Sequence, residues 1–273
     1  RIWVASSNYA EDLRIDYSIL DQHADSYRKI RNTFRYLLGN INDNFENIDL
    51  DNIDISQLPE LEQFMLHKIF VLNDKFKKYF KNYDFHNLYK ELLNFCTVDL
   101  SAFYFDIRKD NLYCDPKDSK KRKSTILLLN IILNSLLKWF APILSFTTEE
   151  IFKLLFKDQK SIHLEKFIEF PDKFKNQKLS EKWSELIKIR NICNISIEEK
   201  RASKEIGSSL EADLKIQLSQ KLKNLTENTD FSEICITSKA EVSYKDDIET
   251  AAITSKAKGS KCSICWKIKE TAC

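Results

Sequence analysis

The cysteines at the end of the sequence have a spacing that is typical of metal ligands. Cys262 and Cys265 form a Cys-x2-Cys knuckle, and Cys273 occupies the last position. A structural Zn²⁺ site needs four ligands, which two such knuckles commonly supply in a tetrahedron. We therefore expect a zinc site that is incomplete within these residues, with weak metal binding by the chain itself. A redox pair or a chance pair of thiols is the alternative interpretation.

An aromatic side chain, Trp266, directly follows the knuckle. It is either the packing partner of the knuckle or a platform on which an unstacked RNA base stacks. The residue types alone leave both interpretations open.

Positive charge is clustered although the chain is nearly neutral. Its 43 Lys and Arg against 41 Asp and Glu leave a net charge of +2, so a polyanion-binding surface must come from clustering. Two clusters occur, one of Arg28, Arg31 and Arg35 on one face of a predicted helix, the other of Lys120, Lys121, Arg122 and Lys123. Each is either a solvated helix surface or a set of phosphate contacts. The second cluster begins a helix, where the helix dipole disfavours positive charge, and this cost of the placement keeps a polyanion contact open beside a solvated helix end.

Amphipathic helices must position these residues. Apolar residues recur at three- and four-residue steps over residues 17–41, from Pro59 to about 81, 85–107 and 124–140, and Thr147 to Glu150 has the pattern of a capping box that opens a fifth helix. Three Gly and four Pro among 273 residues also argue against a loop-rich or all-β protein. The sequence therefore predicts a helical bundle.

The pattern changes after residue 157. Residues 160–172 are predicted as a loop, and one more helix is predicted over about 183–204. Apolar and polar residues alternate over 209–218, 234–237 and 251–258, with a short helix over 218–225, which predicts a small α/β appendage.

One apolar span could suggest a membrane protein. Residues 124–146 are rich in Ile and Leu, but Asn130, Asn134, Lys138 and Pro142 interrupt them. A bilayer span needs about 20 predominantly apolar residues, so a core helix is the better interpretation. Seven Cys without a signal peptide indicate a reducing cytoplasm.

Six segments, in order along the whole chain, carry the pattern of a known family: residues 1–9 (RIWVASSNY), 26–40 (SYRKIRNTFRYLLGN), 99–107 (DLSAFYFDI), 141–151 (APILSFTTEEI), 206–212 (IGSSLEA) and 261–266 (KCSICW). They resemble bacterial-type isoleucyl-tRNA synthetases in the region that follows their catalytic domain. Valine and leucine relatives share the Ala-Pro-Ile-Leu stretch, whereas the last two segments together favour isoleucine.

The resemblance implies a mainly α fold, namely the class Ia anticodon-binding helical bundle followed by a small α/β junction subdomain and a truncated zinc ribbon. It implies that residues 1–16 connect to a catalytic domain, that 17–158 form the bundle and that 159–205 hold a loop and the junction helix. Residues 206–258 would then be the α/β subdomain and 259–273 the incomplete zinc-binding ribbon.

The implied function is to position tRNA(Ile), through its anticodon stem-loop, for aminoacylation by a catalytic domain that uses ATP and Mg²⁺. This chain lacks the His-Ile-Gly-His-type and Lys-Met-Ser-Lys-Ser-type motifs of that domain, since its only methionine is Met65. We expect a C-terminal fragment without catalytic residues and without activity of its own. Its expected partners are tRNA(Ile) and the remainder of the same chain, in a cytoplasmic monomer without membrane contact.

The resemblance carries over to a few residues. Arg14 and Trp266 match tRNA-contacting positions of the family, and Cys262, Cys265 and Cys273 match zinc ligands, with the fourth missing. Ile264 departs from the basic residue that the family often has before the second cysteine, which removes a candidate donor. The two basic clusters rest on charge alone.

Two other functions stay open. One is a free-standing helical RNA-binding adaptor with a zinc ribbon, and the other is a helical scaffold that binds nothing. RNA binding measured across salt concentrations separates a scaffold from both RNA-binding functions, because phosphate contacts make the affinity fall steeply with salt. Exchanging anticodons between tRNAs then separates the synthetase region from the adaptor.

Overall fold

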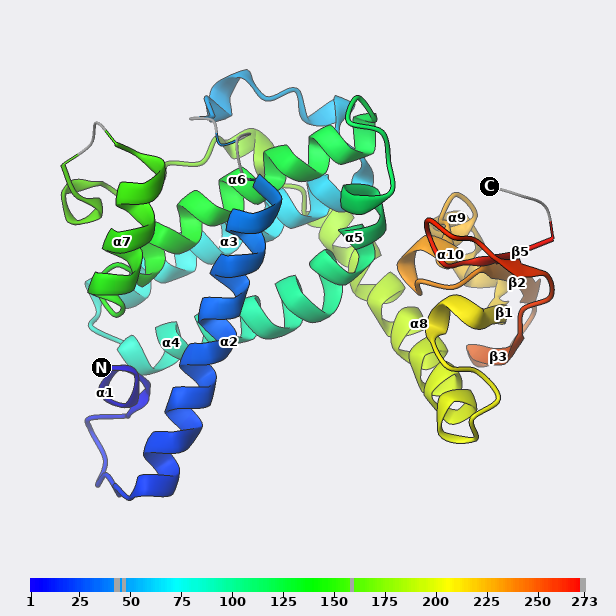
Figure 1. Ribbon diagram of the computed structural model, residues 1–273, viewed down its shortest axis with the longest axis horizontal. Coiled ribbons are helices and arrows are strands. Elements are labelled where there is room, and N and C mark those ends of the chain that lie inside the picture. Colours follow the sequence, from blue (N-terminus) through cyan, green and yellow to red (C-terminus); the bar gives the residue numbers. More distant parts are fainter. Residues whose placement is uncertain (42–44, 46–47, 158–159, 271–273) are drawn as a thin grey trace. The chain divides into compact units, whose positions relative to one another are not determined.

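Residues 1–41, 45, 48–157 and 160–270 are described by the computed structural model of the chain (Figure 1). The chain forms two units, Arg1–Asn176 and Gln177–Cys273. The range 159–205, expected to hold a loop and a junction helix, is divided between them, with the described part of its loop in the first unit and its helix in the second. Of the residues singled out from the sequence, Cys273 lies outside the described ones.

The first unit is built from helices. They are α1 (Ile2–Ser6), α2 (Tyr17–Ile41), α3 (Glu60–Lys81), α4 (Phe85–Asn94), a π-helical stretch (Phe95–Tyr104), α5 (Phe105–Tyr113), α6 (Lys120–Phe140) and α7 (Ser145–Leu155). The four long helices predicted from periodicity are thereby confirmed, with the third running on as one rod from α4 to α5. The connecting segment 1–16, for which no helix was expected, contains the short helix α1.

Side-chain caps explain where three of these helices begin. Asp16 Oδ1 accepts a hydrogen bond from Ile19 N at 2.9 Å ahead of α2, and Asp84 Oδ1 accepts one from Asn87 N at 3.3 Å ahead of α4. Ser119 Oγ accepts one from Arg122 N at 3.4 Å. This last cap starts α6 at Lys120, four residues before the apolar period begins, so the basic run forms the first turn of the helix, as predicted.

The capping box predicted for α7 is wrong. That helix begins at Ser145, so Thr147 already lies inside its first turn, and its Oγ1 lies 2.9 Å from the Tyr27 hydroxyl of α2. Glu149 instead accepts hydrogen bonds from Ser161 Oγ at 2.8 Å and Ile162 N at 3.0 Å. Both side chains therefore make tertiary contacts, which outweigh the local cap.

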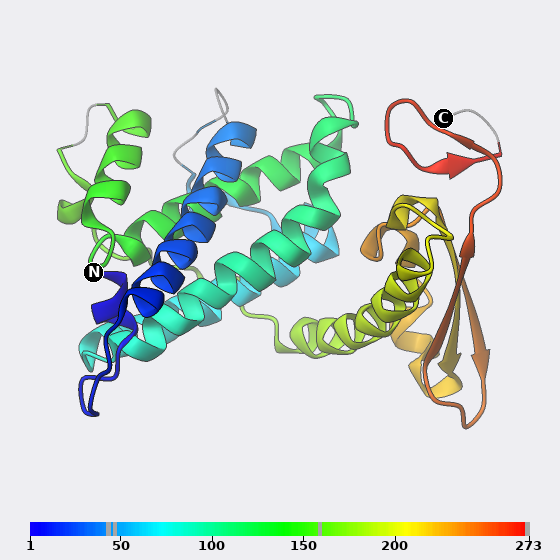
Figure 2. The same cartoon turned by 60° about the horizontal axis from the view of Figure 1, so that its bottom comes forward.

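Helix α6 is the centre of the core. It packs against α2, α3, α5 and α7, and Figure 2 shows α2 crossing it. Its fully buried apolar side chains lie on several sides of the helix: Leu129, Ile132, Leu133, Leu136, Leu137, Trp139 and Phe140. Covering this helix with the others removes its apolar surface from water, at about 25 cal/mol per Å².

A charged network lies inside this core. Arg108 Nε and Nη2 donate to the two carboxylate oxygens of Glu62 at 2.6 and 2.7 Å, and both side chains are buried. The Tyr104 hydroxyl donates to the same carboxylate at 3.0 Å, and Thr125 Oγ1 lies 3.5 Å from it. The network thus joins α3, the π-helical stretch, α5 and α6.

A strap formed by residues 160–176 crosses the first unit. Asn73 Nδ2 of α3 donates to the Ile168 carbonyl at 2.9 Å, and Trp139 Nε1 donates to Asn73 Oδ1 at 3.0 Å. At the end of the strap, Asn176 N donates to His67 Nδ1 at 3.0 Å. Burial lowers the pKa of His67, so its ring stays neutral and able to accept this bond.

The second unit combines α8 (Gln177–Ala202) with a small sheet. The strands β1 (Ala212–Ser219), β2 (Lys239–Lys245) and β3 (Ala251–Lys256) lie in the order β2-β1-β3, with β1 parallel to β2 and antiparallel to β3. Short helices α9 (Lys223–Thr226) and α10 (Phe231–Ile234) connect β1 to β2, and a hairpin of β4 (Ser260–Lys261) and β5 (Ile268–Lys269) follows. Helix α8 contacts β1 and β3.

The prediction of a strand over residues 234–237 is wrong. Asp230 Oδ1 accepts from Ser232 N at 2.9 Å and from Glu233 N at 3.3 Å, which starts α10. Ile236 then takes a left-handed φ of 57°, and the strand begins only at Lys239. A helix cap and a turn therefore precede the strand.

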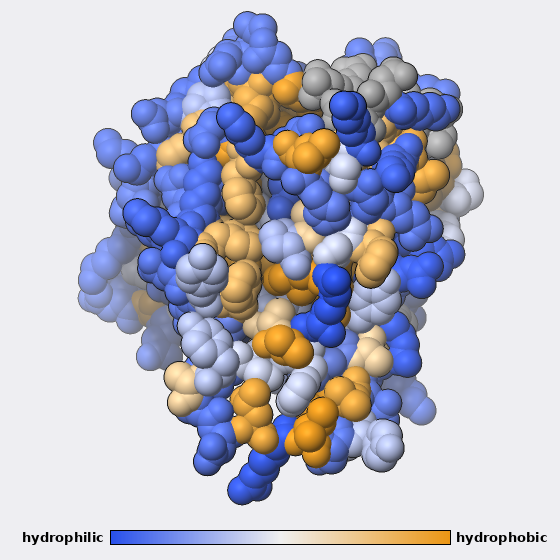
Figure 3. All heavy atoms as spheres, turned by 90° about the vertical axis from the view of Figure 1, so that its left-hand side faces the viewer, coloured by the Kyte–Doolittle hydropathy of each residue, from blue (hydrophilic) through white to orange (hydrophobic). Residues whose placement is uncertain are grey.

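Apolar side chains gather on the face of the first unit that carries α1 and α7 (Figure 3). Val4 of α1, Tyr9 just after it, and Phe146 and Leu154 of α7 are exposed. Val4 and Tyr9 also line a hollow of about 380 Å³ together with Phe85. Among the described residues, no helix combines the length and the apolar character needed to cross a bilayer.

Removing one charge from the buried network should destabilise the chain strongly. We expect Glu62→Gln to lower the free energy of unfolding by about 3–5 kcal/mol, because Arg108 is left buried without its counter-charge. Urea unfolding followed by circular dichroism measures this loss. Asp25→Asn, which breaks an exposed ion pair with Arg28, is the control and should cost less than about 1 kcal/mol. Equal, small losses in both variants would contradict the role given to the network.

Candidate nucleic-acid interface

The arginines of α2 lie on its outer face. Arg28, Arg31 and Arg35 are exposed, whereas Ile30 and Phe34 of the same helix are buried in the core. Arg28 forms an ion pair with Asp25, and among the described residues no ion pair involves Arg31 or Arg35. Guanidinium groups held in a row on a rigid helix suit the phosphates of a nucleic-acid backbone.

The backbone of α2 remains open beyond Arg35. Gly39 follows one turn later, and a Cβ added there would meet nothing within 4 Å. A bulky ligand could therefore approach this end of the helix closely. Gly39 was not singled out from the sequence, although a glycine within a predicted helix interior was the available signal.

The basic run of α6 does not act as one group. Lys120, Lys121 and Lys123 are exposed, and Lys120 Nζ donates to Gln57 Oε1 at 3.1 Å. Arg122 is half-buried, and its Nη1 donates to the Asp115 carbonyl at 2.7 Å. The structure therefore leaves three lysines facing solvent and directs Arg122 to the preceding turn, where it stabilises the loop.

Arg14 lies in an exposed stretch between α1 and α2. Within the described residues, neither burial nor a charge cluster distinguishes it. Its selection rests on the resemblance alone, and the structure places it in the same unit as the two basic clusters.

The knuckle in the second unit has the backbone of a metal-binding turn. Ile264 N points at Cys262 Sγ at 3.4 Å, and Trp266 N donates to the Cys262 carbonyl at 3.1 Å. Trp266 has a left-handed φ of 63°, which closes the turn. An N–H directed at sulfur stabilises the thiolate form, and the thiolate is the form that binds metal.

The donor set of the knuckle suits Zn²⁺, although the described residues supply only part of it. Cys262 and Cys265 are both half-buried at the end of the hairpin, where a metal can reach them. In residues 1–41, 45, 48–157 and 160–270, no group of three or more His, Cys, Asp or Glu side chains could hold an ion. The expected third ligand, Cys273, is outside the described residues.

Three of the other cysteines lie inside the fold. Cys96, Cys193 and Cys235 are buried. Burial raises the pKa of the Cys96 thiol to about 12, so this side chain keeps its proton at neutral pH. The knuckle thus remains the candidate metal centre among the described cysteines.

The hairpin that carries the knuckle is held at a defined place in the second unit. Ile268 N donates to Ser238 Oγ at 2.7 Å, which ties β5 to the start of β2. Gly259 has a φ of 124°, and a Cβ there would lie 2.3 Å from the Lys269 carbonyl oxygen. Only glycine fits this crossing, since any side chain would collide with the opposite strand.

Trp266 lies at the surface beside the knuckle. Its residue surface is 60% exposed, and Lys261 Nζ lies 5.1 Å from the ring centroid. Lys261 adds a positive charge to this surface. The sequence analysis did not name it as a binding residue, although its position next to Cys262 could have indicated one. The arrangement combines an exposed ring and a cation, as in surfaces that stack an unpaired base beside a phosphate.

Comparison with known proteins identifies relatives of the chain. Residues 62–218 match the family model described as the anticodon-binding domain of tRNA ligase. The chain is 70% identical over 273 residues to an isoleucine–tRNA ligase of Pelagibacter ubique, covering 100% of this chain and 30% of that protein. It is 37% and 38% identical to isoleucine–tRNA ligases of Bartonella henselae and Zymomonas mobilis, covering 98% of this chain and 28% of each. The chain therefore spans less than a third of the length of these relatives.

The knuckle should bind metal weakly through its two cysteines. We expect Co²⁺, a coloured substitute for Zn²⁺, to give a sulfur-to-metal absorption band that strengthens as the pH rises, because binding requires thiolates. Cys262→Ser and Cys265→Ser should remove the band, whereas Cys114→Ser, at a half-buried cysteine of the first unit, should leave it unchanged. A band that survives both knuckle substitutions would place the metal elsewhere.

Proposed function

The chain belongs to the family of anticodon-binding domains of tRNA ligases, and from this we propose that it is the tRNA-binding region of an isoleucine–tRNA ligase. In this role it holds tRNA(Ile) by the anticodon stem-loop while a catalytic domain elsewhere in the parent protein carries out aminoacylation. The observation that supports it most directly is the exposed arginine row on α2, whose opposite face is buried in the core.

The first unit supplies the electrostatic part of binding. Arg28, Arg31 and Arg35 on α2, with the exposed lysines at the start of α6, contact phosphates of the stem. Because both helices are packed into one core, the cations are held in place before the RNA arrives, which lowers the entropy cost of binding. Arg14 adds one more cation, and Arg122 acts through the loop that it stabilises.

The second unit supplies the terminal elements of the family. We propose that its α/β part is the junction subdomain and that its hairpin is part of a zinc ribbon. Cys262, Cys265 and Cys273 would hold Zn²⁺ with a fourth ligand from outside these residues. The ion would supply a structural crosslink that orients the knuckle, and Trp266 would stack on an unpaired base of the anticodon loop.

Catalysis belongs to the rest of the parent protein. The relatives that this chain matches are more than three times as long, since it covers 28–30% of them. ATP and Mg²⁺ would bind in that remainder. We propose that the exposed apolar face around Val4, Tyr9 and Phe146 packs against it, because apolar patches rimmed by polar residues are typical of contact surfaces.

Neutralising the arginine row should weaken RNA binding without changing its specificity. With Arg28, Arg31 and Arg35 changed to Gln, we expect the affinity to fall to a similar degree for cognate and non-cognate tRNAs. The slope of log K against log salt should become shallower by about one for each phosphate that the variant no longer neutralises. Fluorescence anisotropy at several salt concentrations measures both quantities.

A matched triple variant controls for total charge. Lys78, Lys81 and Lys90 are exposed lysines of α3 and α4, and changing them to Gln removes the same charge from another surface. This variant should keep most of the slope. An unchanged slope in the arginine variant would remove the α2 face from the binding site.

Removing the exposed tryptophan should affect specificity. We expect Trp266→Ala to weaken binding of tRNA(Ile) by about 1–3 kcal/mol, the usual value of one stacked base, and to weaken a non-cognate tRNA less. Phe146→Ala, at another exposed aromatic residue, should leave both affinities unchanged. Equal losses for the two tRNAs in Trp266→Ala would make this residue a packing element of the knuckle.

A further inference from the structure

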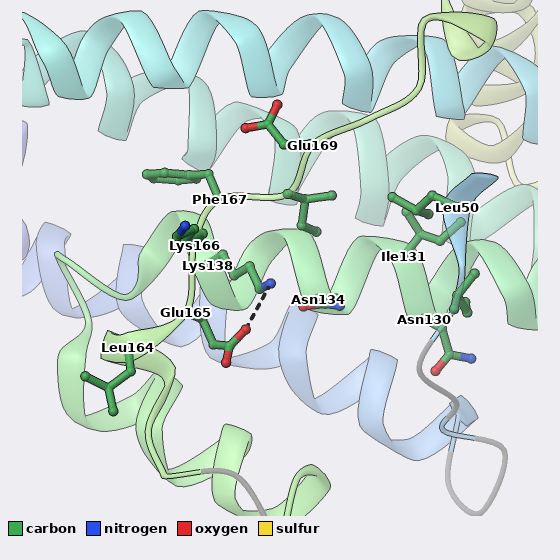
Figure 4. A pocket seen from close by; sticks show the side chains of 12 residues that line it. Leu50, Asn130, Ile131, Asn134, Lys138, Leu164, Glu165, Lys166, Phe167 and Glu169 are labelled. Carbon is green, nitrogen blue, oxygen red and sulfur yellow. Dashed lines mark ion pairs between the residues drawn. The ribbon is translucent and has the colours of Figure 1, made fainter.

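Three polar residues form a stripe along the most buried helix of the chain. Asn130, Asn134 and Lys138 follow one another at four-residue steps on α6 and therefore share one face of it. All three line a groove of about 450 Å³ between α6 and the strap segment from Leu164 to Glu169 (Figure 4). The core helix thus has one polar side, and that side faces a groove rather than another helix.

Two members of the stripe have partners within the protein. Asn130 Nδ2 donates to the Ile126 carbonyl at 3.0 Å, and Lys138 Nζ lies 3.4 Å from Glu165 Oε2 of the strap. Asn134 differs, because in the part of the chain that the structure describes its Oδ1 is buried and has no hydrogen-bond partner. A buried carbonyl oxygen without a donor destabilises the fold unless something outside the protein supplies one.

The charges of the groove do not select an anion. Its lining holds Lys138 and Lys166 beside Glu165 and Glu169, so its formal charges cancel, although Glu169 also pairs with Lys77 Nζ at 2.7 Å. A phosphate or carboxylate placed here would meet two carboxylates as well as two lysines. A neutral group is therefore the occupant that these charges favour.

The walls of the groove suit a flat ring. Ile131 and Leu50 form apolar parts of the lining, and the Phe167 ring lies there on the strap. Phe167 is held by the Phe80 ring, with 5.0 Å between the two centroids. A neutral ring with a polar edge could thus lie against apolar walls and present its edge to the Asn134 amide.

We propose that this groove takes an unstacked nucleobase of the bound RNA, paired through its edge with the Asn134 amide, and this inference rests on the proposed function. An amide offers a donor beside an acceptor, and the edge of adenine, with its amino group beside a ring nitrogen, is complementary to it. The pairing requires the Asn134 amide to turn about its last side-chain torsion, which has two broad, roughly equivalent positions. The base then supplies the donor that the fold does not.

Free adenosine is the first probe of this site. Titrated into the full chain, it should shift the side-chain amide signals of Asn134 in nitrogen-15 NMR spectra, whereas ribose 5-phosphate, which has the sugar and the phosphate but no base, should not. Adenosine should shift no Asn amide signal in Asn134→Leu. Spectra unchanged by adenosine, or changed equally by ribose 5-phosphate, would overturn the proposal and leave a groove that holds only water or anions.

The second test uses tRNA(Ile). Asn134→Leu should weaken its binding about tenfold at an unchanged salt slope, because the substitution removes a hydrogen bond to a base and leaves the phosphate-binding cations in place. The control is Ser135→Ala. The buried Ser135 hydroxyl donates to the Ile131 carbonyl at 2.7 Å, and Ser135 does not line the groove. Thermal unfolding should show both variants folded, with Asn134→Leu at least as stable as the unaltered chain.

The two proposals fail in different ways. If the unaltered chain does not bind tRNA at all, the proposed function is wrong. If it binds tRNA and Asn134→Leu binds equally well, the function stands and the nucleobase groove is wrong. Should Asn134→Leu fail to fold, the adenosine titration of the unaltered chain alone decides.

Discussion

The ion pair between Glu62 and Arg108 is the constraint on which the first unit depends. Both charges are out of contact with water, and such a pair is tolerated only when its hydrogen bonds are well aligned. The pair therefore sets how α3 and the α4–α5 rod lie against each other. Thr125 reaches the same carboxylate from α6, one turn after Lys121. The start of α6, with its exposed lysines, is thereby held by the same interaction that orders the core.

In this arrangement the inner and outer faces of each helix have different roles. The inner faces supply the apolar burial that stabilises the unit, and the outer faces of α2 and α6 are left to carry charge that the fold itself does not need. Exposed cations of this kind reduce the stability of the fold little, because water solvates them. Their backbone positions are nevertheless fixed, because their helices are packed into the core. A rigid bundle is thus well suited to hold a folded RNA by its backbone, where position matters more than base identity.

The second unit uses backbone geometry in place of a large core. The left-handed turn at Trp266, the glycine crossing at Gly259 and the bond from Ile268 to Ser238 place the knuckle before any metal is considered. The hairpin presents an aromatic ring, a lysine and two thiols within a few residues. In the proposed function, the first unit would hold the RNA electrostatically and the second would read it locally, two physical tasks carried by different parts of the chain.

The sequence by itself determined the long helices of the first unit, the outward arginine row of α2 and the cysteine knuckle, because periodicity, caps and ligand spacing depend on residues within a turn or two of one another. It did not reveal that Arg122 turns inward, that Thr147 and Glu149 bond across the fold, or that α10 precedes β2. The Glu62–Arg108 pair spans 46 residues, and the groove at Asn134 is closed by a strap some 30 residues further along. Only tertiary packing decides such contacts, since they depend on which helix faces meet after the chain has folded.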